Sequence, residues 1–394
     1  MMVLISLAAC GGSSAPHALV TASTSASATA SPTPSESPVA TPSVIPAPPI
    51  APPSVAPPPP PNLTCAGQYQ AEHPLLAAPI VAQGYGALAV LDVSDPLAPS
   101  LVCTVTNWPY ANQPIQWLSR SEFLLVLPGR PNRILDVDVV RRSMTTFRDL
   151  NGDVGLARLS PDRAWLATME YKTDGTSFAR LYGPTGERTL AAYPVIGGHG
   201  GSIYGFGGPT IGFSPDGSLV VAVDYAANYV DSSVPNLQVF DLQGSRMLAA
   251  AKGLWAVWVK ASLYYSDDRN VYRWTRGSDP VAILHASWIQ PAGAPDGRNL
   301  AYLTYPGYKY NLDVLDTKSG SAKTLNATGQ RIYPLFVTPN LLWASEMQVC
   351  DNCYGGSRST GKVFAYDLST GAESEVRLPD LLGPLMGASL SGGA

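Results

Sequence analysis

The segment 213–225 reads FSPDGSLVVAVDY, and it decides the fold of this chain. A Ser-Pro-Asp-Gly turn stands directly before an alternating run of apolar residues. Proline fixes φ where the turn begins, Asp216 can bond to its own backbone two residues on, and Gly217 supplies a positive φ. The pattern therefore predicts two antiparallel strands joined by a tight turn.

The same pattern recurs along the chain. Segment 159–171 reads LSPDRAWLATMEY, segment 293–305 reads GAPDGRNLAYLTY, and segment 337–347, VTPNLLWASEM, is a degenerate copy. The prolines of successive copies lie 54, 80 and 44 residues apart. The longest gap holds one more unit of this shape at 254–274. Internal repeats of this length indicate an array of similar structural units.

Further strands complete each unit. Units without the full turn motif occur at 86–105 and 115–138, and a third strand ends at Asp241, Asp316 or Asp367 in the later units. Four short strands in about 40–50 residues are typical of propeller blades. We therefore expect an all-β fold: a single β-propeller of about seven four-stranded blades, spanning residues 63–380 and followed by a flexible C-terminal tail, 381–394.

The Ser-Pro-Asp-Gly turn and the strands around it resemble the WD-type repeats of TolB-like propellers. The resemblance implies the propeller fold and says almost nothing about activity, because propellers host enzymes, receptors and scaffolds alike.

The first ten residues resemble a bacterial lipoprotein signal. Residues 1–9 read MMVLISLAA, and Leu7-Ala8-Ala9-Cys10 resembles a lipobox, which implies that Cys10 carries the lipid. A signal peptide has a basic segment before its apolar core, and here no Lys or Arg precedes that core. We therefore interpret residues 1–9 as the remnant of a signal peptide whose true start lies upstream.

Residues 10–62 are expected to form a disordered linker. Residues 11–62 contain 15 prolines, and Glu36 is the one charged side chain of residues 1–62. Such a segment cannot bury enough apolar surface to offset its ordering entropy. As polyproline II, it would reach on the order of 160 Å. It would hold the propeller away from a membrane.

Composition narrows the compartment and the partners. The formal net charge of −4 over 394 residues argues against nucleic-acid binding, which requires a basic surface. The sequence contains no run of 18 or more apolar residues, so no transmembrane helix is predicted. We expect a monomer held at the cell membrane through lipidated Cys10 and facing the extracytoplasmic side, either the periplasm or the cell surface. Its partner would be an envelope protein or a glycan.

The four remaining cysteines favour disulfides, because their number is even and the compartment is oxidising. A bond between Cys65 and Cys103 would join the end of the linker to the first blade. Cys350 and Cys353 form a CxxC in a loop of the last unit. A structural disulfide is the preferred interpretation there, with half a metal site or a redox pair as alternatives.

No catalytic constellation stands out in the sequence. It has no G-x-S-x-G elbow and only four histidines, so neither a catalytic residue, a metal site nor a cofactor is predicted. The alternative is a propeller enzyme, a polysaccharide lyase or glycoside hydrolase, with its site at the channel mouth. Such enzymes need paired carboxylates or a Tyr/His–Arg set near the pocket. The candidate loops offer Asp231, Asp267, Asp268 and Asp351.

The expected binding face carries the loops between the second and third strands of each blade and the connections between blades. Several of these loops are aromatic, and aromatic planes suit sugar stacking or peptide capture. Tyr171, Tyr225 and Tyr305 recur at one repeat position, and we expect them mainly to pack between blades. The candidate binding residues are Tyr204, Phe206, Tyr229, Tyr308, Tyr310 and Tyr354.

Overall fold

Every regular element in the described part of the chain is a β-strand: the computed structural model contains 29 strands and no helix there. Residues 57–394 form one compact unit. The structure describes residues 60–66, 69, 72–80, 87–108, 116–127, 132–151, 153–172, 174, 176–193, 210–224, 233–267, 269–306, 309–325, 329–349, 357–379, 382 and 389–391.

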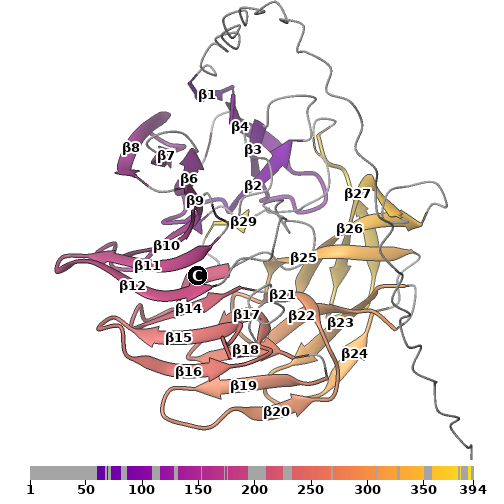
Figure 1. Cartoon of the computed structure of the whole chain (residues 1–394). Coiled ribbons are helices and arrows are strands. Elements are labelled where there is room, and N and C mark those ends of the chain that lie inside the picture. The colour runs from indigo at the N-terminus through magenta and orange to yellow at the C-terminus, as the bar shows by residue number, and fades with distance from the viewer. Residues whose placement is uncertain are drawn as a thin grey trace, which may run out of the picture. The chain divides into compact units, whose positions relative to one another are not determined.

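The strands form seven antiparallel sheets, which are the blades of a β-propeller (Figure 1). Blade 1 contains β1 (Asn62–Cys65), β2 (Leu75–Ile80), β3 (Ala87–Asp92), β4 (Ser100–Thr106) and β29 (Ser389–Leu390). Blade 2 contains β5 (Gln116–Trp117), β6 (Glu122–Leu127), β7 (Asn132–Asp138) and β8 (Ser143–Leu150). Blade 3 contains β9 (Asp153–Leu159), β10 (Leu166–Tyr171), β11 (Ser177–Gly183) and β12 (Gly186–Tyr193).

The remaining four blades follow in chain order. Blade 4 contains β13 (Thr210–Phe213), β14 (Leu219–Val223), β15 (Leu237–Asp241) and β16 (Arg246–Ala250). Blade 5 contains β17 (Leu254–Val259), β18 (Ser262–Ser266), β19 (Val271–Thr275) and β20 (Val281–Leu284). Blade 6 contains β21 (Ile289–Gly293), β22 (Asn299–Thr304), β23 (Asn311–Asp316) and β24 (Ala322–Thr324). Blade 7 contains β25 (Gln330–Thr338), β26 (Leu341–Val349), β27 (Ser357–Asp367) and β28 (Glu373–Val376). The expected seven-bladed, all-β propeller is confirmed.

The core lies between the blades. Seven clusters of buried apolar side chains each join one pair of neighbouring blades, and the cluster between blades 7 and 1 closes the ring. Strand β2 illustrates how one strand contributes side chains to two of these clusters. Leu75 and Ala77 face the blade 1–2 cluster, whereas Leu76 and Ala78 face the blade 7–1 cluster. Because successive side chains point to opposite sides of a strand, a strand buried on both sides is apolar throughout.

The Ser-Pro-Asp-Gly turns form as predicted between the first and second strands of a blade. Ser214 Oγ donates to Asp216 Oδ1 at 2.5 Å and accepts from the Leu219 N–H at 3.0 Å. Gly217 has φ +72°, and Arg163 occupies the corresponding place in blade 3 with φ +61°. A non-glycine residue in this left-handed region is uncommon.

The C-terminal segment differs from the prediction. Residues 381–394 were expected to form a flexible tail, whereas β29 pairs with β2, Leu390 lying opposite Leu76. Strand β29 thereby supplies the first strand of blade 1, and the blade combines both ends of the domain. The domain boundary placed at residue 380 therefore lies before its closing strand. A strand of two residues carries too little alternation to be recognised in a sequence.

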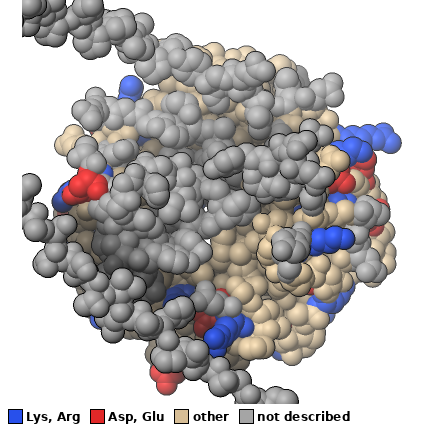
Figure 2. Space-filling view, turned by 45° about the vertical axis from the view of Figure 1, so that its right-hand side comes forward, with Lys and Arg blue, Asp and Glu red and all other residues tan. Residues whose placement is uncertain are grey.

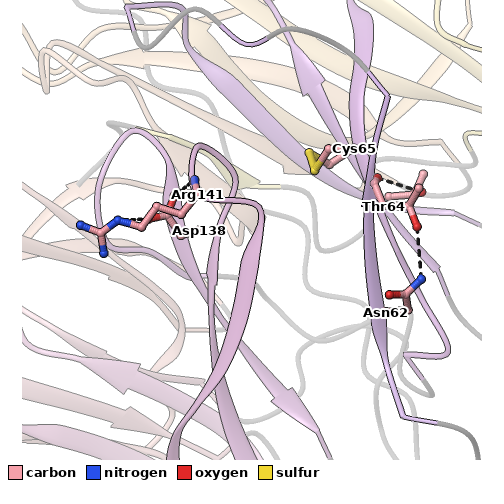
Figure 3. The surroundings of a disulfide bond; sticks show 7 residues. Asn62, Thr64, Cys65, Asp138 and Arg141 are labelled. Atoms are coloured by element: carbon pink, nitrogen blue, oxygen red, sulfur yellow. Dashed lines mark hydrogen bonds and ion pairs between the residues drawn. A yellow bond between two sulfur atoms is a disulfide. The ribbon is translucent and has the colours of Figure 1, made fainter.

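Strand β1 is a fifth strand on the outer side of blade 1, beside β4 (Figure 1). Cys65 lies opposite Cys103 in this pairing, and their sulfur atoms are bonded, as the sequence favoured (Figure 3). The bond spans 38 residues of sequence and holds the first described segment of the chain against blade 1.

The part of the surface seen in Figure 2 carries mixed charges. Lys and Arg side chains adjoin Asp and Glu side chains at several places near the edge of the molecule, and other Lys and Arg side chains stand apart from them. Among the described residues, no helix is long and apolar enough to cross a membrane.

Candidate functional site: a polar groove between blades 6 and 7

The two ends of the blades carry different connections. One end carries the tight turns between first and second strands and between third and fourth strands. The other end, which we call the loop face, carries the connections between second and third strands and from one blade to the next. Of the six aromatic residues predicted for binding, Tyr310 is described and lies on the loop face. Tyr204, Phe206, Tyr229, Tyr308 and Tyr354 lie outside the described residues, as do Cys10, Cys350 and Cys353.

A groove of about 680 Å³ opens on the loop face between blades 6 and 7. Blade 6 contributes the end of the loop before β23 and the segment around β24, and blade 7 contributes the start of β25 and the loop-face ends of β26 and β27. Leu312 and Met347 belong to both the groove wall and the buried cluster between these blades. The groove is therefore the open end of a packed interface and rests on strands.

Arg331 lies beneath the groove, and its side chain is completely buried. Its Nε donates to the Tyr366 hydroxyl at 2.8 Å, and its Nη2 pairs with Glu373 Oε1. The guanidinium carbon lies 4.0 Å from the centre of the Phe364 ring. A buried cation is costly unless it is paired and hydrogen-bonded, and these partners supply both.

The strand register explains how these partners meet. Arg331 on β25 lies opposite Glu346 on β26, and Tyr366 on β27 lies opposite Glu373 on β28. Arg331 Nη1 also lies 3.5 Å from Glu346 Oε1. Burial, together with the hydrogen bond to Glu373, raises the pKa of Tyr366. The hydroxyl therefore stays protonated and donates to Glu373 at 2.7 Å.

Glu346 forms one wall of the groove. Thr360 Oγ1 donates to Glu346 Oε2 at 2.8 Å, while Oε1 faces Arg331. The carboxylate is thus held in one orientation by a hydroxyl on one side and a guanidinium on the other. Fixed polar groups of this kind present a defined hydrogen-bonding surface to a ligand.

Two tyrosines form the aromatic edge of the groove. Tyr310 lines the groove, and the centre of its ring lies 4.8 Å from that of Tyr305 at an interplanar angle of 44°. Burial raises the pKa of Tyr310, and the neighbouring Tyr305 adds to this rise. Tyr305 is 52% exposed, so the expectation that it packs between blades is wrong: it lies half in solvent against Tyr310.

Among the described residues, none of the carboxylates proposed for a propeller enzyme lines the groove. Asp267 caps its own loop in blade 5, accepting from the backbone N–H groups of Arg269 and Asn270 at 2.7 and 2.6 Å. Asp231, Asp268 and Asp351 lie outside the described residues. Glu346 is the one carboxylate among the described residues that line the groove.

The sequence analysis did not identify Arg331, Glu346 or Thr360. One feature of the sequence could have indicated this network: Arg331 is a charged residue at the start of a strongly apolar segment, RIYPLFV, at 331–337. Its carboxylate partners stand 15 and 42 positions further along the chain. Only the register of blade 7 brings them together.

Comparison with known proteins shows similarity of fold only. No protein-family description matches this sequence, and no curated protein matches it. An oligogalacturonate lyase in complex with manganese has a TM-score of 0.49 and 13% identity, over 81% of this chain and 85% of that one. The Cps50 (Swd1) β-propeller domain of Myceliophteria thermophila has a TM-score of 0.46 and 15% identity, over 73% and 96%. TolB from Acinetobacter baumannii has a TM-score of 0.42 and 14% identity, over 82% and 86%.

Proposed function

We propose that this chain is a non-enzymatic binding module of the cell envelope, anchored by lipid on Cys10 and carried on the 10–62 linker. Its loop face recognises an envelope protein or a glycan through the groove between blades 6 and 7. The observation that carries the proposal is the groove itself, whose polar wall is fixed by the buried Arg331 network. Binding sites are concave and place a few oriented polar groups on a mostly preformed surface.

The disulfide supports the extracytoplasmic part of the proposal. A bond such as Cys65–Cys103 persists in oxidising compartments and is rare in the cytosol. It ties β1, which begins at the end of the linker, to the body of the propeller. A pull on the linker would then be borne by blade 1 as a whole.

A non-enzymatic role is supported by the state of the groove carboxylate. Glu346 is paired with Arg331 and accepts from Thr360. Acid–base cleavage of a glycosidic bond uses two carboxyl groups on either side of the scissile bond. The described lining of the groove supplies one, and that one is engaged by the protein.

The binding role is tested by capture from envelope extracts. The full chain, carrying Cys10→Ala and immobilised through a tag within residues 11–56, is compared with two further variants. Gln348→Arg places a bulky charge on the exposed groove wall. Lys318→Ala alters an exposed residue in the turn between β23 and β24 of blade 6, which also borders the groove, but at the end of the blade opposite the loop face.

We expect a specific partner to be retained by the Lys318→Ala variant and lost from the Gln348→Arg variant. Glycans incubated with the chain should keep their length. Equal capture by both variants would place the binding surface elsewhere, and shortening of a glycan would establish an enzyme instead.

The anchor has its own test. In its native host, the Cys10→Ala variant should move from the membrane fraction to the soluble extracytoplasmic fraction, because the acyl chains that hold the protein are attached to that thiol. Continued retention of the variant in membranes would refute the lipid anchor while leaving the groove proposal intact.

A further inference from the structure

We infer that the groove between blades 6 and 7 takes an uncharged oligosaccharide, with Tyr305 and Tyr310 as the stacking platform at its edge. This inference rests on the binding function proposed above and narrows its ligand to one chemical class. It is carried by three features of the groove: its charge balance, its polar groups and its aromatic edge.

The buried cation of the groove is paired within the protein. The Arg331 side chain is 0% exposed and directs its guanidinium to Tyr366, Glu373 and Glu346. It therefore offers no free cation to an acidic ligand. Lys309 at the rim is the remaining cation among the described lining residues, and Glu346 is the one anion among them. A polyuronate would need several cations along its length, since each exposed ion pair contributes at most about 1 kcal/mol.

The remaining polar lining consists of side-chain amides and hydroxyls. These belong to Asn311, Thr324, Gln330, Gln348 and Thr360. Each amide both donates and accepts, as the hydroxyl groups of a sugar do. The hydroxyls of Thr324 and Thr360 donate to Asp313 and Glu346, so they offer their lone pairs to a ligand. Gln330 is held in place, because its Oε1 accepts from the Tyr310 N–H at 3.5 Å. Such a wall fits a ligand that exchanges hydrogen bonds in both directions along its length.

The aromatic edge supplies the apolar contact that a neutral sugar requires. Tyr305 is 52% exposed and contacts Tyr310, which is itself part of the lining. A pyranose ring presents a C–H face to such a plane, and rigid aromatic side chains bind at low entropic cost. The volume of about 680 Å³ is within the range of ligand pockets.

The test measures binding of defined oligosaccharides to the full chain by isothermal titration calorimetry. The neutral probes are cellotetraose, xylotetraose, mannotetraose and N-acetylated chitotetraose. Tetragalacturonate is the size-matched anionic probe, and a library of soluble peptides is the macromolecular alternative. We expect at least one neutral probe to bind and tetragalacturonate to bind more weakly by a factor of about ten or more.

Variants locate the binding in the groove. Tyr305→Ala removes an exposed ring and should weaken binding of the neutral probe by roughly three- to tenfold, which is a loss of about 0.7–1.4 kcal/mol and is within the range for one aromatic contact. Tyr305→Phe retains the ring and should stay within about twofold of the parent chain. Phe147→Ala is the matched control, because Phe147 is another exposed aromatic residue, 40% exposed, on β8 of blade 2. It should leave affinity unchanged.

The outcomes separate this inference from the binding function beneath it. Tighter binding of tetragalacturonate than of every neutral probe would overturn the ligand class, and so would binding of none of the neutral probes. Peptide binding that Tyr305→Ala weakens would also overturn the ligand class while upholding the groove as a binding site. Equal weakening by Tyr305→Ala and Phe147→Ala would overturn the assigned location.

Discussion

The backbone N–H of Leu75 donates a hydrogen bond to the hydroxyl of Ser391 at 2.7 Å, although the two residues stand 316 positions apart. The N–H of Ser391 in turn donates to the Leu75 carbonyl at 2.7 Å. These bonds continue the pairing of β29 with β2 and join the two ends of the propeller within blade 1. Residues 389–391 therefore contribute to closure of the ring, together with the apolar cluster between blades 7 and 1.

Ser391→Ala should lower the free energy of unfolding by about 1–3 kcal/mol, because it leaves the buried Leu75 N–H without its acceptor. Removal of residues 389–394 should cost more, since it also uncovers the inner edge of β2. Urea denaturation measures both changes. Ser100→Ala, at an exposed position of β4, is the control and should stay within about 0.5 kcal/mol of the parent chain. A truncated chain as stable as the parent would show that the closing strand is dispensable.

Reduction of the Cys65–Cys103 bond should destabilise the protein by about 2–4 kcal/mol, because the bond constrains the unfolded chain. Cys103 is buried in the blade 1–2 cluster, whereas Cys65 lies on the outermost strand. We therefore expect β1 to detach first. Amide hydrogen exchange should show lost protection at 62–65 before any change in blades 3 to 6.

Hydrogen exchange and thermal unfolding are also measured on the reduced parent chain and on a Cys65→Ser variant without reductant, which separates loss of the bond from side effects of the reagent. An unchanged midpoint of thermal unfolding in both experiments would mean that β1 is held by its backbone pairing alone.

The propeller itself was accessible from the sequence for a physical reason. Each Ser-Pro-Asp-Gly turn is determined by its own residues, as the bonds of Ser214 and Asp216 show, so the repeat survives as a local pattern. Strand β29 could not be recognised, because it is two residues long and forms only against β2. The Arg331 network was also invisible, since its members come from four strands of blade 7 and meet through register. Five of the six aromatic residues predicted for binding lie outside the described residues.

Arg163→Gly should be nearly neutral at pH 7 because it makes two opposing changes. Glycine relieves the positive φ of this turn position, which is +61°, and adopts it readily. The substitution also removes the ion pair between Arg163 Nη2 and Glu122 Oε2, which are 2.6 Å apart near the surface. Each effect is of the order of 1 kcal/mol or less.

Acid should reveal the ion pair. The hydrogen bond from Arg163 lowers the pKa of Glu122 below its ordinary 4.5. A lowered pKa gives stability that is present above the unfolded pKa and is lost as the pH falls through the folded value. The parent chain should lose this contribution below about pH 4.5, whereas the Arg163→Gly variant has less to lose, because only Ser119 and Arg141 still lower the pKa of Glu122. We therefore expect the free energy of unfolding of the variant, relative to that of the parent chain, to be higher near pH 3 than at neutral pH. Urea denaturation at the two pH values measures this difference. A constant difference between the two proteins would contradict this account.

Arg331→Met should be the most damaging single change in blade 7. It leaves Glu373 and Tyr366 without the buried cation that they bond to, and breaking a buried pair from one side costs about 3–5 kcal/mol. Adding Glu373→Gln to Arg331→Met should recover part of the loss, because it removes the unpaired charge. Lys362→Met is the matched control: it breaks the Lys362–Glu375 pair, whose side chains are both 51% exposed, and should cost less than about 1 kcal/mol. Chemical denaturation measures the free energy of unfolding of the parent chain, the two single variants and the double variant. If Arg331→Met proved as mild as Lys362→Met, the network would not be what fixes the groove wall, and the position of Glu346 would need another cause.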